Sequence, residues 1–306
     1  MKLSVNTGFL VNRYPSPSQW ARVINELNVR YIQLTSDLFS PYYDTNILNK
    51  YVDQINDLKN KYDFSINSVF TGGFTRVNHF CHPDEFVREY WMNWFKKFIK
   101  YADLLGANRL GSHIGILSIP DNHNQREFFQ NRCIKLWTIL SEYAEGTGIK
   151  ELTWEHMSIE REQGHVQRDI DYIIKNFMET KVPIRLCLDP DHGDLSSSDS
   201  RDYEPYGLLE KYLPFSSQLH LKQTSLDKRK NSTFTSKNNK NGLIEGDKVA
   251  NLLKKYVPED KKEDFELILE LNAREREPDD SLICEEVKES LNYWRKVLER
   301  NNIKYE

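Results

Sequence analysis

Residues 151–155, Glu-Leu-Thr-Trp-Glu, form a short apolar run that ends in a carboxylate. Apolar residues with helical spacing follow this run, at Ile170, Ile173, Ile174 and Phe177. A short apolar run followed by a segment of helical period predicts a β-strand and then an α-helix. The fold is decided by how often this strand–helix unit recurs.

The same unit recurs along the whole chain. The predicted strands are Lys2–Asn6, 31–34, 64–70, Arg109–His113, Glu151–Glu155, Ile184–Leu188, 218–221 and 265–271. Strands separated by helices pair in parallel, because each crossover returns the chain to the same end of the sheet. Eight such units predict an α/β protein with a closed TIM (β/α)8 barrel.

An open, doubly wound sheet is the alternative fold. The sequence favours it less, because no GxGxxG motif follows the first strand. The composition does not shift along the chain, so we expect a single domain over residues 1–306. Its long polar loops, 190–204 and 224–242, both follow strands, and in a TIM barrel such loops lie on the catalytic face.

The composition excludes several classes of protein. Hydrophobic residues make up 39% of the 306 residues, which is enough for a large core. A net charge of −4 gives no global attraction for nucleic acid or anionic membranes. The four cysteines form no CxxC pair, which is typical of a reducing compartment. No apolar run approaches the ~18 residues of a membrane span, and no signal peptide is evident, so we expect a cytoplasmic protein.

Polar residues end or interrupt four successive apolar runs, at Glu155, Asp189, His220 and Glu270. A carboxylate buried in such a run costs several kcal/mol unless it is paired, hydrogen-bonded or bound to a cation. A buried ion pair could explain any one of them. At one barrel mouth, however, three carboxylates around one imidazole repel each other unless a cation lies between them. The pattern predicts one divalent ion, Mn²⁺, Mg²⁺ or Co²⁺, rather than a thiolate-rich zinc site.

Four motifs in this order resemble the metal-site strands of the xylose isomerase-like family, which includes sugar and sugar-phosphate isomerases and epimerases. They are Thr-Trp-Glu at 153–155, Leu-Asp-Pro-Asp-His-Gly at 188–193, Leu-His-Leu-Lys at 219–222 and Leu-Glu at 269–270. The resemblance implies that Glu155, Asp189, His220 and Glu270 are the metal ligands. It also implies that His192 contacts the substrate.

The chemistry implied by this resemblance is proton transfer next to a carbonyl group. A metal bound to a carbonyl oxygen and a neighbouring hydroxyl stabilises the enediolate that forms when the carbon loses its proton. By resemblance, Glu155 and Glu270 take and return this proton as well as holding the metal. Return to the same carbon gives epimerisation and return to its neighbour gives isomerisation, and the sequence leaves both open.

Three further residues are considered for the site. His113 either lines the sugar pocket or is a hydrogen-bonded structural residue. Lys222 shares a strand face with His220, so it either contacts a substrate hydroxyl or phosphate or neutralises nearby carboxylates. His156 follows Glu155 and should face the other way, which favours a packing role or a role behind the ligands.

The substrate is expected to be a small sugar or sugar phosphate. Residues 6–15 and 219–224 faintly resemble tetrulose-phosphate and branched-pentose (apiose) isomerases. A phosphate could be bound by the basic residues of the 224–242 loop, which is otherwise a solvated loop; these are Lys228, Arg229, Lys230, Lys237 and Lys240. The family resemblance also implies a homo-oligomer, a dimer or a tetramer.

Other functions remain as alternatives. A dehydratase acting on an inosose-type polyol uses the same metal-enediolate chemistry. A non-catalytic polyol-binding barrel is a further alternative, although binding alone does not need two opposed glutamates. An apurinic-site endonuclease needs three metal ions, and the strand ends offer too few histidines for them.

Overall fold

The computed structural model describes residues 1–225, 232–271 and 280–306. Eight strands form a closed barrel in chain order, and every neighbouring pair is parallel, including the closing pair of first and last strand. The strands are β1 (Lys2–Asn6), β2 (Tyr31–Thr35), β3 (Ser65–Phe70), β4 (Arg109–His113), β5 (Glu151–Glu155), β6 (Ile184–Leu188), β7 (Ser216–Leu221) and β8 (Glu266–Leu269). The structure confirms the predicted TIM barrel, and the open sheet is excluded.

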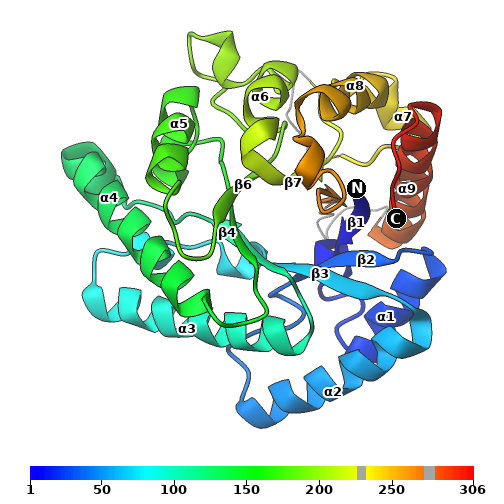
Figure 1. Cartoon of the computed structure of the whole chain (residues 1–306), viewed down its shortest axis with the longest axis horizontal. Coiled ribbons are helices and arrows are strands. Elements are labelled where there is room, and N and C mark those ends of the chain that lie inside the picture. Colours follow the sequence, from blue (N-terminus) through cyan, green and yellow to red (C-terminus); the bar gives the residue numbers. More distant parts are fainter. Residues whose placement is uncertain (226–231, 272–279) are drawn as a thin grey trace.

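The α-helices lie around the outside of the barrel (Figure 1). They are α1 (Pro17–Glu26), α2 (Thr45–Tyr62), α3 (Glu85–Leu104), α4 (Ile119–Ala144), α5 (Gln167–Asn176), α6 (Pro205–Tyr212), α7 (Ser236–Asn239), α8 (Gly246–Tyr256) and α9 (Ile283–Arg300). Gly106, with φ of +76°, follows the end of α3 in the left-handed conformation that glycine adopts most readily.

The apolar spacing of Cys133, Leu136, Trp137 and Leu140 predicts a helix over residues 126–143, but α4 begins earlier, at Ile119. Its first turn is fixed by Ser118, whose hydroxyl accepts a hydrogen bond from the backbone N–H of Asp121. Gln125 is non-helical, with φ of −148°, so a kink separates this polar first segment from the amphipathic remainder. Capping and a kink, rather than a hydrophobic stripe, therefore determine where α4 starts.

Apolar side chains fill the space between the strands and the helices, and four tryptophans are completely buried there: Trp20, Trp137, Trp154 and Trp294. The interior of the barrel is more polar. Gln218 Nε2 donates to Glu266 Oε2 at 2.8 Å, and Thr153 Oγ1 donates to Gln218 Oε1 at 2.7 Å. Each of these buried groups has a hydrogen-bond partner, as a polar interior requires.

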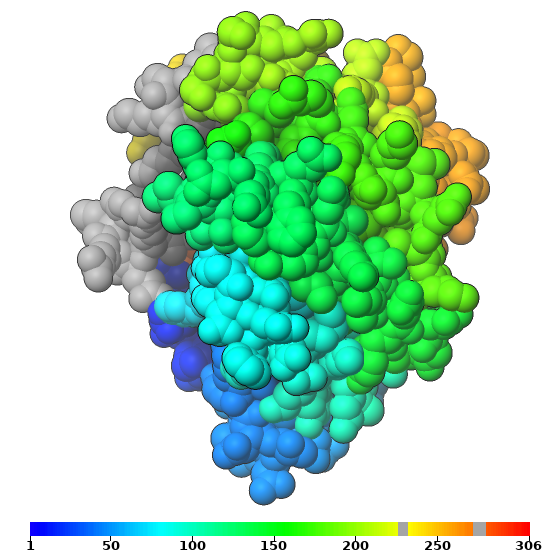
Figure 2. Space-filling view, turned by 90° about the vertical axis from the view of Figure 1, so that its left-hand side faces the viewer, coloured from blue at the N-terminus to red at the C-terminus, as the bar shows by residue number. Residues whose placement is uncertain are grey.

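The outer surface is formed by neighbouring helices. Figure 2 shows α3, in cyan, between α2, in blue, and α4, in green, and these helices contact each other in this order. Among the described residues, no helix combines the length and the apolar composition that crossing a membrane requires.

Candidate metal centre

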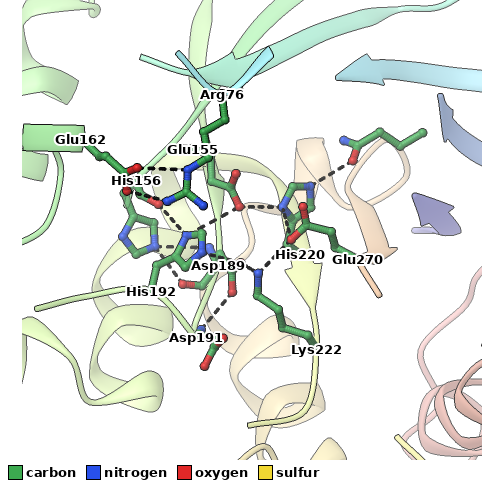
Figure 3. Close-up of polar contacts among 11 residues, drawn as sticks. Arg76, Glu155, His156, Glu162, Asp189, Asp191, His192, His220, Lys222 and Glu270 are labelled. Carbon is green, nitrogen blue, oxygen red and sulfur yellow. Dashed lines mark hydrogen bonds and ion pairs between the residues drawn. The ribbon is translucent and has the colours of Figure 1, made fainter. Parts of the chain in front are cut away.

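The four predicted ligands lie at the ends of four consecutive strands. Glu155 is the last residue of β5, Asp189 follows β6, His220 lies in β7 and Glu270 follows β8. Because all strands of the barrel are parallel, their carboxyl ends meet at one rim. Each of the four residues offers a ligand atom that lies within 4.8 Å of the other three (Figure 3). The barrel thus brings together a set of residues that could hold one metal ion.

The charges of this cluster fit a divalent cation. Glu155 and Asp189 are buried, at 6% and 0% exposed, and Glu270 is nearly so. Burial raises the pKa of Glu155 to about 7, and the neighbouring charges of Glu270 and Asp189 act in the same direction against the effect of His220. A cation placed between three such carboxylates would favour their ionised forms.

Lys222 supplies part of the balancing charge. Its Nζ lies 2.5 Å from Asp189 Oδ2 and 2.8 Å from Glu270 Oε2. Although burial acts against it, these carboxylates raise the pKa of Lys222 well above its usual value, so the ammonium stays charged. Three carboxylates and one ammonium leave two negative charges, which one divalent ion neutralises.

The surroundings of Asp189 Oδ2 also favour a metal ion in this cluster. Despite the nearby ammonium, this buried oxygen accepts no hydrogen bond of ordinary geometry from the described residues. Its other oxygen, Oδ1, accepts the backbone N–H of Asp191 at 2.9 Å. Burial would raise the pKa of Asp189, but neighbouring positive charge, including that of Lys222, outweighs it and holds the carboxyl ionised. An ionised, buried carboxylate oxygen at the centre of the cluster is suited to a metal ion.

His220 directs its two ring nitrogens to different partners. Nδ1 lies 2.8 Å from Glu155 Oε1 and 3.5 Å from Glu270 Oε2, whereas Nε2 lies 3.0 Å from Gln33 Oε1 on β2. Nδ1 is therefore the atom that faces the carboxylates. Burial lowers the pKa of His220, but Cys187 and the two glutamates outweigh it, so the ring is charged until a metal displaces its Nδ1 proton.

His192 faces the cluster from the turn after β6. Its Nδ1 lies 2.8 Å from the carbonyl oxygen of His156, which can only accept, so Nδ1 carries a hydrogen. Burial lowers the pKa of His192 to about 3, so the ring is neutral and Nε2 is an acceptor. This nitrogen faces Asp189 Oδ2 at 3.5 Å. As an acceptor at the edge of the cluster, Nε2 suits a hydrogen-bond donor such as a hydroxyl of a ligand.

His156 and His113 are both buried but differ in their surroundings. His156 Nε2 contacts the backbone carbonyl of Asp189 at 2.9 Å, so it lies behind the cluster, as its place in the strand predicts. His113, at the end of β4, stacks on His79 with ring centroids 4.4 Å apart. Neither ring nitrogen of His113 has a hydrogen-bond partner among the described residues. Burial lowers its pKa to about 3, so His113 is a neutral ring.

Some residues at the mouth were not predicted from the sequence. Arg76, after the 3-10 helix at Gly73–Thr75, forms a two-point ion pair with Glu162 of the 3-10 helix at Glu160–Glu162, at 3.0 and 2.6 Å (Figure 3). Glu162 raises the pKa of Arg76 against its burial, and the charges of Glu155 and Glu270 act in the same direction. Gln33 interrupts the apolar run of β2, just as the four candidate ligands interrupt or end theirs. Because its amide carries no charge, this interruption did not mark Gln33 as a site residue.

The predicted phosphate-binding loop is described only in part. Lys228, Arg229 and Lys230 lie outside the described residues, so their predicted role stays a prediction. Lys237 and Lys240 are exposed, on α7 and at its end.

Gly111 in β4 makes room for the aromatic ring that packs on His220. Phe70 meets the imidazole edge-on, with ring centroids 5.2 Å apart. A Cβ on Gly111 would lie 2.2 Å from Phe70 Cε2 and 2.4 Å from Thr153 Oγ1. We expect Gly111→Ala to lower the free energy of unfolding by about 1–3 kcal/mol, because overpacking a core displaces its neighbours.

Urea unfolding followed by circular dichroism measures this effect. Gly146→Ala is the control for space, since nothing lies within 4 Å of a Cβ there, although its φ of +85° adds backbone strain of its own. A Gly111→Ala protein as stable as the wild type would show that Phe70 is not held in place by this contact.

Comparison with known proteins gives relatives along the whole chain, although no family model matches it. A curated relative, D-erythrulose 1-phosphate 3-epimerase of Brucella abortus (strain 2308), is 31% identical over 299 residues. The match covers 96% of this chain and 95% of the relative.

Two solved structures have the same fold. A protein of Rhodospirillum rubrum described as a xylose isomerase superposes with a TM-score of 0.83 at 21% identity, over 97% of this chain and 99% of that chain. D-Psicose 3-epimerase of Clostridium cellulolyticum H10 superposes with a TM-score of 0.70 at 13% identity, again over 97% and 99%.

Proposed function

Because the chain belongs to the xylose isomerase-like family of sugar isomerases and epimerases, we propose that it is a divalent-metal-dependent 3-epimerase of a tetrulose phosphate. The observation that carries the proposal is the cluster of Glu155, Asp189, His220 and Glu270, whose ligand atoms lie within 4.8 Å of one another. The phosphorylated C4 substrate is taken from the 31% identical relative, which is a D-erythrulose 1-phosphate 3-epimerase.

The metal would be held by these four residues through three carboxylates and His220 Nδ1. Oxygen ligands with one imidazole suit Mn²⁺, Mg²⁺ or Co²⁺. When bound, the ion supplies Lewis-acid chemistry, polarising the C2 carbonyl of the sugar and making the C3–H bond more acidic.

In this proposal the two glutamates, Glu155 and Glu270, move the proton. Glu155 comes from the first and Glu270 from the last of the four ligand strands, so they flank the space that the sugar would enter. Removing the proton of C3 with one carboxylate and returning a proton to the opposite face with the other inverts the configuration of that carbon. Their environments already differ, since Glu155 has a raised pKa while Lys222 and His220 outweigh burial and lower that of Glu270.

In this proposal two histidines orient the sugar. His192 Nε2 is an acceptor that faces the cluster, so it suits a sugar hydroxyl that donates to it. His113 offers ring nitrogens without partners among the described residues and lies at the end of β4, beside the ligand strands. Lys222, which contacts two of the carboxylates, serves in this proposal mainly to balance charge.

The proposal is tested by incubating the Mn²⁺-loaded protein with D-erythrulose 1-phosphate. Appearance of its C3 epimer, separated by chiral chromatography after dephosphorylation, would support it. An unchanged substrate, with the related C5 and C6 ketoses converted instead, would contradict the tetrulose assignment.

The phosphate needs a cation at the mouth, and we propose Arg76. Its side chain is 50% exposed while two hydrogen bonds to Glu162 fix its guanidinium. A planar guanidinium suits phosphate oxygens. We expect Arg76→Gln to raise KM for the phosphorylated tetrulose by about 10- to 100-fold, since a hydrogen bond to a charged group contributes about 1.5–3 kcal/mol.

Steady-state kinetics with erythrulose and its 1-phosphate measure this effect. The unphosphorylated sugar is the control, and its kcat/KM should change far less. An equal loss for both sugars would show that Arg76 holds Glu162 rather than the phosphate.

A further inference from the structure

A chain of three hydrogen-bond contacts leads from Gly8, just after β1, through Asn6 of β1 and Gln33 of β2 to His220. The backbone N–H of Gly8 donates to Asn6 Oδ1 at 2.7 Å. Asn6 Nδ2 donates to Gln33 Oε1 at 2.6 Å, and the same oxygen lies 3.0 Å from His220 Nε2. Asn6, Gln33 and His220 are 5%, 0% and 0% exposed, so bulk water cannot replace these contacts.

The direction of every hydrogen bond in this chain follows from its first member. A backbone N–H can only donate, so the atom of Asn6 that faces Gly8 is the oxygen and the atom that faces Gln33 is the amide nitrogen. That nitrogen can only donate, so Gln33 presents its oxygen. An amide oxygen can only accept, and His220 Nε2 must therefore carry a hydrogen.

The other amide atom of Gln33 shows that this orientation is enforced. Gln33 Nε2 is buried and has no hydrogen-bond partner among the described residues. A buried unpaired N–H costs about 1–3 kcal/mol. Rotating the amide by 180° would not relieve this cost, because it would place two NH₂ groups against each other at 2.6 Å.

From this geometry we infer that Asn6 and Gln33 are positioning residues that keep the hydrogen of His220 on Nε2 and so leave Nδ1 free to bind the metal. The inference rests on the proposed function in one respect, namely that a metal binds the cluster. Nδ1 is the nitrogen that faces Glu155 and Glu270, so a hydrogen on it would exclude the ion. Residues behind metal ligands commonly act in this way.

Two substitutions of equal size and equal charge separate this role from packing. In Asn6→Asp the new carboxylate still accepts from Gly8 but cannot donate, so the Gln33 amide turns and its NH₂ faces His220. Nε2 must then accept, and the hydrogen moves to Nδ1. In Gln33→Glu the new carboxylate accepts from both Asn6 and His220, so the hydrogen stays on Nε2.

We expect Asn6→Asp to weaken Mn²⁺ binding by about 10- to 100-fold, the range typical of residues behind metal ligands. Gln33→Glu should bind Mn²⁺ at least as tightly as the wild type. Both variants add one negative charge near the ion, so charge alone would strengthen Mn²⁺ binding in both. Isothermal titration at pH 8, well above the usual carboxyl pKa of about 4, measures the affinities.

Nitrogen-15 NMR of His220 in the Mg²⁺-loaded and metal-free proteins gives a second readout. A proton on Nε2 is expected in the wild type and in Gln33→Glu, and its loss in Asn6→Asp. If Asn6→Asp does not fold, Gln33→Met, which removes the acceptor, should give the same weaker binding. Equal affinities and equal Nε2–H signals in all proteins would overturn the inference. Because the NMR signal is read without turnover, it tests the role of Asn6 and Gln33 even if the protein epimerises no sugar.

Discussion

Glu155→Gln is expected to lower kcat for the epimerisation by about 10³-fold, since a positioned general acid or base contributes about 10²- to 10⁴-fold. Glutamine keeps the shape of the side chain but cannot exchange a proton at this step. Glu270→Gln should have an effect of the same order, because the reaction needs one group on each face of C3. Steady-state kinetics under saturating Mn²⁺ measure both.

Glu151→Gln is the matched control for Glu155→Gln. Glu151 begins β5, at the opposite end of the barrel, where it accepts a hydrogen bond from Arg109 Nε at 2.7 Å. This variant should lose some stability and keep its kcat. Near-normal turnover in either site variant would exclude that glutamate from proton transfer, and a wild-type-like Mn²⁺ titration in the same variant would exclude it as a ligand.

Removal of the metal is expected to have the second large effect. Treatment with EDTA should abolish turnover and added Mn²⁺ should restore it. Asp189→Asn should weaken Mn²⁺ binding by more than about 100-fold, beyond the 10- to 100-fold typical of residues behind the ligands. The physical reason is that the substitution replaces a buried, negatively charged ligand by a neutral amide.

Thermal unfolding gives a readout of metal binding that does not depend on activity. A bound ion stabilises the folded state by mass action, so Mn²⁺ should raise the Tm of the wild type but not that of Asp189→Asn. Asp194→Asn is the control in the same loop, since Asp194 bonds Ser196 and not the cluster. An EDTA-treated protein with full activity would contradict metal dependence.

The barrel could be predicted from the sequence because each strand is a short apolar run and each following helix has its own periodicity. β1, β4, β5 and β6 begin and end where the runs do. The start of α4 could not be predicted, because the residues after Ser118 form no buried apolar stripe and a cap fixes the first turn. Hydrophobic periodicity reflects which residues are buried, so it does not predict structure that hydrogen bonds determine.

The clustering of the four candidate ligands could be predicted for a related reason. A charged group inside an apolar run is costly to bury, so the presence of Asp189 or Glu270 there predicts that a cation or a hydrogen-bond donor lies beside it. The contact between Arg76 and Glu162 gives no such signal, because these residues lie 86 positions apart in two loops. Gln33 gives a weak signal, and only the structure shows that its oxygen faces His220.

The most direct test of the central claim is incubation of the Mn²⁺-loaded protein with the tetrulose 1-phosphate in D₂O, followed by NMR. Proton transfer at the carbon next to the carbonyl predicts one deuterium at C3 in the inverted product, and no inverted product in a Glu155→Gln or Glu270→Gln reaction. Three results would contradict the account. They are inversion without deuterium, deuterium at C1 instead of C3, and loss of water from an inosose with no exchange in any ketose.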